Sequence, residues 1–264
     1  MMQRAVRVLV LSLILAVGSG SLLAQQSRSQ ADNRLDEPVQ REPRVRAKLH
    51  TELGALYFQD GNIPVAMEEL TVAIYIDPTY APAYGMRALV HHYLKEYNHA
   101  EDNFRDALRY GPEDPDIANN YGWFLCQIGK YKEGMAQFDR ALRNRLYQTP
   151  DRAYLNAGQC ALAMGDLKLA EENTEKAVRF SGGLATARLQ LAQIYFRTDR
   201  LEEARREANN LLAKVDPNAE LLWLAIRIER KVGDREAEQR HAIQLRRKFP
   251  TSPEYQALLK GNFE

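Results

Sequence analysis

Amphipathic segments with helical periodicity occur along the chain in pairs. Leu53, Gly54 and Tyr57 fall on one face of a first segment, and Leu70 and Ala73 fall on one face of the second. The Asp-Gly-Asn triplet between the segments predicts a turn, because glycine readily adopts the backbone conformation that ends a helix. The pattern therefore predicts a hairpin of two helices.

The hairpin pattern recurs with a period of about 34 residues, which is typical of tetratricopeptide repeats. Its copies begin near residues 47, 81, 115, 151, 185 and 218. A small residue returns at the eighth position of each copy, where paired helices must approach closely: Gly54, Ala88, Gly122, Gly158, Ala192 and Ala225. One hairpin cannot bury its apolar face alone, so we expect an all-α solenoid of about six hairpins in a right-handed superhelix.

Three further segments flank the repeats. The pattern assigns residues 1–24 to a signal peptide, 25–45 to a flexible linker, 46–250 to the tetratricopeptide-repeat domain and 251–264 to a C-terminal capping segment. The linker holds few large apolar side chains, so it cannot bury enough surface to offset its ordering entropy. Ser252 followed by Pro253 is a helix-start signal, which predicts a short closing helix over residues 253–260.

The first segment has the three parts of an export signal. Arg4 and Arg7 form a basic start, and an apolar run from Val8 to Val17 follows. Small residues then lead to a cleavage position after Ala24. The apolar run alone is too short to span a bilayer. We expect a protein of the periplasm, free or at the inner face of the outer membrane, with an uncleaved anchor as the alternative.

The two cysteines, Cys126 and Cys160, bear on anchoring and on redox state. No cysteine precedes Cys126, so the usual lipid attachment at a cleavage position has no acceptor. Membrane association would then be only indirect, or through an uncleaved signal. The two cysteines are offset by two places in neighbouring first helices, which turns their side chains in different directions. We expect buried free thiols, and a disulfide in an oxidising compartment is the alternative.

Charge and motif content argue against several classes of function. The 264 residues include 36 Lys+Arg and 35 Asp+Glu, which gives no bulk attraction for nucleic acid. No phosphate-binding loop, zinc-protease motif or nucleophile elbow occurs in the sequence. His91 and His92 are adjacent, so on a helix they point about 100° apart and cannot readily share an ion. We expect no enzymatic activity, cofactor, metal or small-molecule substrate.

Three segments carry a resemblance to one family of repeat proteins. They are Asn119–Leu125, Arg140–Leu142 followed by Leu146-Tyr147, and Leu245–Pro250 followed by Ser252–Tyr255. Through them, over roughly residues 46–260, the chain resembles the type IV pilus biogenesis and stability proteins called PilF or PilW. The resemblance implies a pilotin, which helps the pilus secretin subunit to reach the outer membrane and to multimerise there. Members are typically lipoproteins, so the missing acceptor cysteine is a departure from the family.

Resemblance to other tetratricopeptide arrays implies where a partner binds. Positions two, five, nine, twelve and thirteen of a unit line a concave groove formed by the first helices. The partner-binding candidates are Phe58, Leu89, Tyr93, Asn119, Asn120, Trp123, Gln127, Leu155 and Gln159. Asn119 and Trp123 stand out, because helix propensity does not explain an Asn pair in mid-helix. Aromatic rings beside amides suit a partner segment with apolar side chains and backbone groups to offer.

These observations predict a non-enzymatic periplasmic binding protein for type IV pilus biogenesis, with the pilus secretin subunit as partner. Its expected role is to assist secretin assembly or stability in the outer membrane. A periplasmic scaffold for another envelope assembly complex is the first alternative. An accessory domain of an enzyme system is the second.

Overall fold

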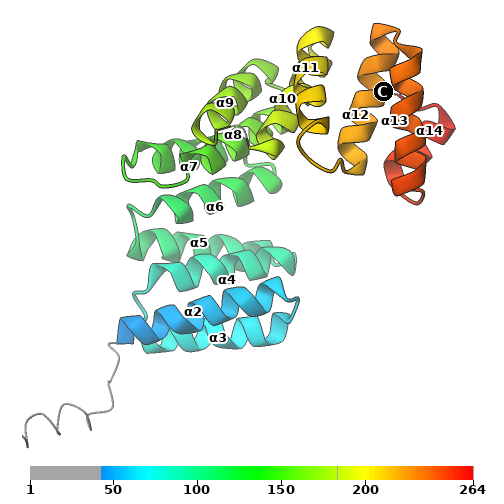
Figure 1. Ribbon diagram of the computed structural model, residues 1–264. Helices are drawn as coiled ribbons and strands as arrows, with labels where there is room; N and C mark the ends of the chain where they lie inside the picture. Colours follow the sequence, from blue (N-terminus) through cyan, green and yellow to red (C-terminus); the bar gives the residue numbers. More distant parts are fainter. Residues whose placement is uncertain (1–42, 183, 264) are drawn as a thin grey trace, which may run out of the picture.

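The protein is a curved stack of helical hairpins (Figure 1). The computed structural model describes residues 43–182 and 184–263, and these ranges hold thirteen helices and no strand. The expected all-α tetratricopeptide solenoid is confirmed. The predicted signal peptide and most of the predicted linker lie outside the described residues. No helix in the described ranges is long and apolar enough to cross a membrane.

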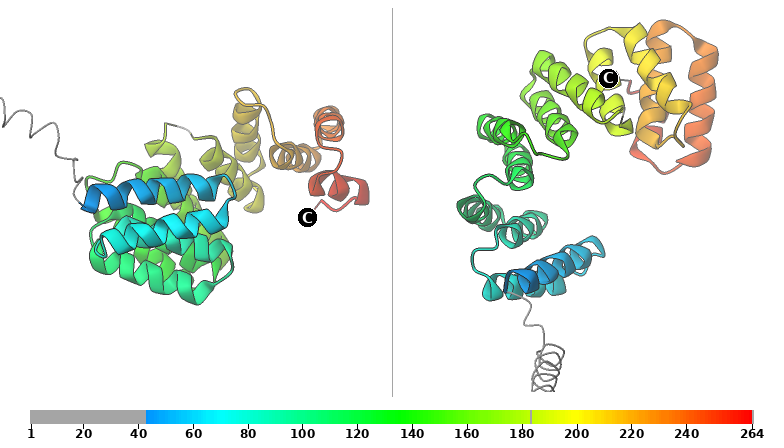
Figure 2. Two further views of the ribbon diagram at one scale, coloured as in Figure 1. Left: turned by 90° about the horizontal axis from the view of Figure 1, so that it is seen from below. Right: turned by 60° about the vertical axis from the view of Figure 1, so that its left-hand side comes forward.

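Each hairpin pairs a first helix with a second helix that follows it after a short turn. The hairpins are α2 (Pro43–Gln59) with α3 (Ile63–Ile76), α4 (Ala81–Tyr93) with α5 (Tyr97–Tyr110), α6 (Pro115–Gln127) with α7 (Tyr131–Arg143), α8 (Pro150–Met164) with α9 (Leu167–Phe180), α10 (Ala185–Arg197) with α11 (Leu201–Leu212), and α12 (Ala219–Val232) with α13 (Arg235–Lys248). Figure 2 shows that α2 and α13 lie at opposite ends of the arc.

The helix boundaries follow local sequence signals. Helix α2 begins at Pro43, ahead of the expected boundary at residue 46, because proline is favoured at the first helical position and good helix formers follow it. At the other end, the predicted closing helix is present as α14 (Pro253–Lys260). The Ser252 side chain accepts a hydrogen bond from the Tyr255 amide there, and α14 packs against α12 and α13.

Small residues at the eighth position of a unit let the two helices of a hairpin approach closely. A Cβ added at Gly122 of α6 would lie 2.8 Å from Phe138 Cε1 and 2.9 Å from the Gly134 carbonyl oxygen of α7. In the first hairpin, a Cβ at Gly54 would lie 2.8 Å from Leu70 Cγ. The large core side chains of the second helix therefore rest directly on the backbone of the first.

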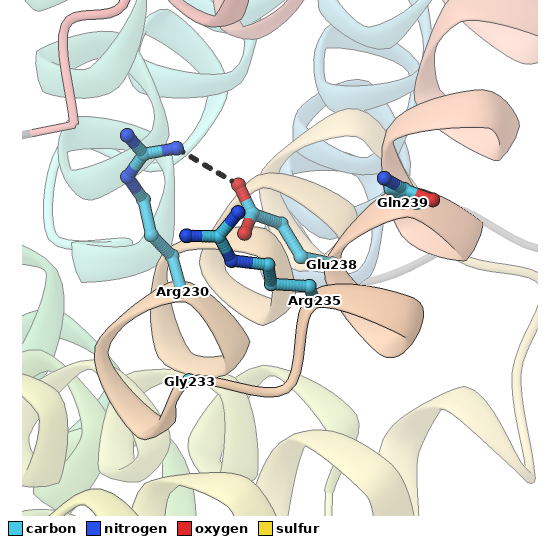
Figure 3. A pocket seen from close by; sticks show the side chains of 5 residues that line it. All are labelled: Arg230, Gly233, Arg235, Glu238 and Gln239. Atoms are coloured by element: carbon cyan, nitrogen blue, oxygen red, sulfur yellow. Dashed lines mark hydrogen bonds and ion pairs between the residues drawn. The ribbon is translucent and has the colours of Figure 1, made fainter.

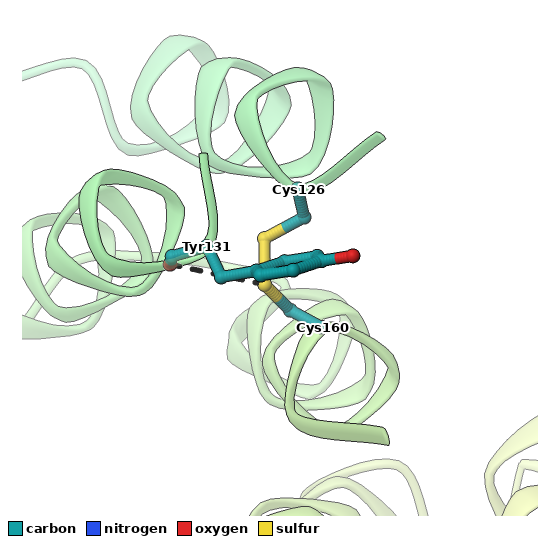
Figure 4. The surroundings of a disulfide bond; sticks show 3 residues. All are labelled: Cys126, Tyr131 and Cys160. Carbon is teal, nitrogen blue, oxygen red and sulfur yellow. Dashed lines mark hydrogen bonds between the residues drawn. A yellow bond between two sulfur atoms is a disulfide. The ribbon is translucent and has the colours of Figure 1, made fainter. Parts of the chain in front are cut away.

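Cys126 of α6 and Cys160 of α8 form a disulfide, with 5.6 Å between their Cα atoms (Figure 4). The expectation of free thiols is wrong. An offset of two places turns the side chains about 200° apart on their own helices. Because α6 and α8 are neighbours and run in similar directions, the side chain of Cys126 then faces α8 and that of Cys160 faces α6, so the two meet across the interface. The bond lies beside the ring of Tyr131 and against the buried Phe138 cluster.

We expect Gly122→Leu to lower the free energy of unfolding by about 1–3 kcal/mol or more, because the new side chain overpacks the contact with Phe138 and the α7 backbone. Denaturant melts measure the change. Ala136→Leu, at an exposed position of α7, is the matched control and should shift stability by no more than about 0.5 kcal/mol. Equal stability of the two variants would contradict the close approach of α6 and α7.

Replacing both cysteines by Ala should cost about 2–4 kcal/mol, because the bridge closes a loop across 34 residues of sequence and restricts the unfolded chain. Reductant should destabilise the wild-type protein and leave the double variant unaffected. A thiol titration of the unreduced, denatured protein should find no free thiol. Two titratable thiols in that experiment would show that the bridge is absent.

Candidate partner-binding groove

The first helices of the hairpins line two hollows, one in each half of the arc. The first hollow, of about 320 Å³, lies across α2, α4 and α6. Ala55, Leu89 and Ile117 supply part of its apolar lining, one from each helix. Because its walls come from three consecutive units, the hollow exists only when the hairpins are stacked.

The rim of the first hollow is acidic. Its lining includes the carboxylates of Glu52, Asp114 and Asp116 and no lysine or arginine. Asp114 also caps α6, since its Oδ1 accepts hydrogen bonds from the amides of Asp116 (3.0 Å) and Ile117 (3.1 Å). Partial burial and the Asp114 charge raise the pKa of Asp116, against a lowering effect of Arg152. A cation near this rim would therefore be favoured.

The second hollow, of about 490 Å³, lies across α8, α10 and α12. Phe196 and Trp223 give it aromatic walls, and Arg197 and Arg227 give it cationic ones. The Arg227 guanidinium lies 4.5 Å from the Phe196 ring centroid, and burial lowers the pKa of Arg227. The second hollow thus combines aromatic surface with fixed positive charge, although Glu220 also lines it.

A third hollow, of about 510 Å³, lies where α12 ends and α13 begins (Figure 3). Arg230, Arg235, Glu238 and Gln239 line it beside Gly233. Arg230 Nη1 pairs with Glu238 Oε1 at 2.9 Å, and these charged groups offer no apolar anchor. The third hollow is therefore less suited to an apolar partner segment than the other two.

Four of the predicted binding residues lie on or near the first hollow. Leu89 and Asn120 line it directly. Phe58 of α2 and Tyr93 of α4 pack edge to face, with ring centroids 5.5 Å apart. Tyr93 keeps 62% of its surface exposed, so this pair presents an aromatic edge near the C-terminal ends of α2 and α4.

The two most favoured residues of the sequence argument lie in the contacts between hairpins. Asn119 is 5% exposed, and its Oδ1 accepts a hydrogen bond of 3.0 Å from Asn156 Nδ2 on α8. Trp123 is half-buried and packs edge to face on His92, with centroids 4.8 Å apart. Burial lowers the pKa of His92. Both residues hold neighbouring first helices together, which is sufficient to explain their presence.

The remaining candidates, Gln127, Leu155 and Gln159, lie on α6 and α8 between the two hollows. Gln127 and Gln159 are exposed. Leu155 is half-buried, and its carbonyl accepts a hydrogen bond of 3.4 Å from Gln190 Nε2. A binding role for the nine candidate residues stays a prediction.

Trp223 and Arg227 were missed in the sequence because no groove residue was named in the weak sixth copy. Helix α12 begins at Ala219, as α10 begins at Ala185. Counting from the helix start places Glu220, Trp223 and Arg227 at positions two, five and nine, and all three line the second hollow. Aligning the units by the first residues of their helices would have identified these groove positions in the sixth copy, where the repeat pattern is weak.

Comparisons with known proteins agree with this architecture. The tetratricopeptide repeat family model matches residues 86–148 and 127–185. The type IV pilus assembly protein PilF of Pseudomonas aeruginosa is 30% identical over 207 residues, which are 78% of this chain and 82% of that protein. The crystal structure of PilW, a widely conserved type IV pilus biogenesis factor, superposes with a TM-score of 0.76 at 31% identity, covering 81% of this chain and 98% of PilW.

The structure of P. aeruginosa PilF superposes with a TM-score of 0.74 at 28% identity, and the match covers 83% of this chain and 99% of that one. These likenesses extend over the array of hairpins rather than over one or two repeats. The resemblance carried by the three sequence segments is therefore confirmed. The chain belongs to the PilF/PilW family of tetratricopeptide-repeat proteins of type IV pilus biogenesis.

Proposed function

We propose that this protein is a non-enzymatic periplasmic binding protein that assists assembly or stability of the outer-membrane pilus secretin. One observation carries the proposal: a member of the PilF/PilW family presents two hollows along its first helices, where tetratricopeptide solenoids offer an extended binding surface. The apolar lining with charged rims matches the anatomy of protein interfaces.

Two features support the periplasmic location. Residues 1–24 have the layout of an export signal. The Cys126–Cys160 bridge fits an oxidising compartment, because disulfides persist in the bacterial periplasm and are rare in the cytosol. The two features are independent, since one is an N-terminal pattern and the other a contact between repeats.

The charges of the two hollows restrict the partner segment. The first hollow carries Glu52, Asp114 and Asp116, whereas the second carries Arg197 and Arg227. A segment of the secretin subunit that fills both hollows would present apolar side chains throughout, a basic residue at the first and an acidic residue at the second. Such charge complementarity mainly sets orientation and specificity.

We expect the mature chain to begin after Ala24 and to appear in the periplasmic fraction, because residues 1–24 follow the signal-peptide pattern. N-terminal sequencing of the protein purified from cell envelopes measures the cleavage. Metabolic labelling with a palmitate analogue should leave the protein unmarked. Retention of residues 1–24, or incorporation of the label, would contradict this part of the proposal.

We expect Tyr93→Ala to weaken binding of the secretin subunit at least about thirtyfold, because truncation of an aromatic anchor typically costs about 2 kcal/mol or more. Tyr75→Ala is the matched control. Tyr75 is 86% exposed but lies on the second helix α3, so its loss should leave binding unchanged.

Binding of purified protein to the secretin subunit, and the ratio of secretin multimer to monomer in outer membranes, are the two readouts. Tyr75→Ala should melt as the wild type does because Tyr75 is exposed, and Tyr93→Ala should stay folded with a loss of no more than about 1.5 kcal/mol from its contact with Phe58. If Tyr93→Ala binds normally and secretin multimers persist, the first helices are not the binding surface. If the wild-type protein itself fails to bind the subunit, the secretin is not the partner.

A further inference from the structure

We propose that His91, Glu96 and His99 form a zinc-binding site at the turn of the second hairpin. One ligand atom from each of these residues lies within 4.8 Å of the other two. His91 stands in the last turn of α4, Glu96 directly precedes α5, and His99 stands in the first turn of α5. Imidazole nitrogens and a carboxylate oxygen are ligands that zinc prefers in proteins.

Both histidines direct a ring nitrogen toward the same carboxylate oxygen. His91 Nδ1 lies 2.6 Å from Glu96 Oε2, and His99 Nδ1 lies 3.9 Å from it. The two imidazole rings have centroids 5.3 Å apart and are tilted by 39°. A zinc ion bound at about 2.0–2.2 Å from three such atoms holds them roughly 3.3–3.6 Å apart in a tetrahedron. Zinc binding therefore requires Glu96 to withdraw from His91 by roughly 1 Å and His99 to move toward the other two ligands.

The side chains that must move are the exposed ones. The side chains of Glu96 and His99 are 46% and 70% exposed, whereas that of His91 is 13% exposed. His91 thus supplies a fixed ligand, and the other two can adjust around it. Because the side chains of Glu96 and His99 are exposed, water or a partner group could reach a bound ion and complete its tetrahedron.

The backbone that carries the three ligands is firmly held. The Glu96 amide donates to the His91 carbonyl at 2.9 Å, which closes the turn. Asn103 Nδ2 donates to the His99 carbonyl at 2.8 Å, and Arg87 Nε of α4 donates to Asn103 Oδ1 at 2.7 Å. This chain of hydrogen bonds joins α4 to the first turn of α5, so the backbone positions of the three ligand residues are set before any ion arrives.

The site was overlooked in the sequence because it crosses a turn. The expectation of no metal rested on the adjacent pair His91-His92 and on the absence of two histidines one helical turn apart. At the turn, ligands from two antiparallel helices come close in space. Their sequence spacing differs from that of ligands on one face of a single helix. The proposal revises that expectation, and it is independent of the secretin role.

The chain also provides a matched control in His50. His50 Nδ1 lies 2.6 Å from Glu69 Oε2, the same pairing as in His91 and Glu96, but no third ligand accompanies it among the described residues. If a histidine–carboxylate pair alone bound zinc, both places would bind. If three ligands are needed, only the turn of the second hairpin does.

The test is isothermal titration of zinc chloride into the full protein purified without a polyhistidine tag and stripped of metal with a chelator. We expect one equivalent of zinc to bind and to raise the thermal midpoint, because a ligand of the folded state stabilises it. His99→Ala should weaken zinc binding by more than about tenfold and abolish the thermal shift. His50→Ala should retain both.

His99 is the ligand chosen for replacement because it is largely exposed, so the variant should keep the wild-type melting curve in the absence of zinc. Glu96→Gln, which removes the anionic ligand, provides a second variant and should also weaken binding. The proposal is overturned if the wild type binds no zinc, or if His99→Ala and Glu96→Gln bind it as the wild type does. Loss of binding in His50→Ala alone would place the ion at the other pair and would overturn it equally.

Discussion

The close approach of paired helices at the eighth position of each unit is the constraint on which the structure depends. Where Gly54, Gly122 and Gly158 stand, a Cβ would lie too near atoms of the second helix. The absence of side chains there brings Leu70 and Phe138 onto the backbone of the first helices and fixes the angle within each hairpin. Repetition of that angle gives the arc, and the arc places the first helices side by side along the two hollows.

The disulfide has a defined place in this arrangement. It joins α6, the last helix of the first hollow, to α8, the first helix of the second. The Asn119–Asn156 hydrogen bond connects the same two helices. A connection between hairpins, residues 144–149, also falls here. Covalent and polar links thus reinforce the junction between α6 and α8, and they hold the two hollows in a fixed relation.

The sequence predicted the hairpins and the closing helix, because each depends on local periodicity and on caps. Leu89 and the Phe58–Tyr93 pair follow from position within a unit. Contacts between side chains of different units were harder to predict from the sequence. The offset of Cys126 and Cys160 was read as a barrier to pairing, although facing helices require such an offset. The binding candidate Asn119 proved to be buried between hairpins, since position alone does not distinguish a groove side chain from one that contacts the next helix.

The modular arrangement limits how far a local change can spread. In a solenoid each hairpin contacts mainly its neighbours, so stability is approximately a sum of unit and interface contributions. The Phe58–Tyr93 pair and Trp223 lie in opposite halves of the arc, in units that share no contact. Their side chains therefore act independently on the fold, and the free energies of contact in the two hollows should add. A partner that engages both hollows couples them through its own chain and through the α6–α8 junction. Binding at one hollow then favours binding at the other only if this junction is rigid.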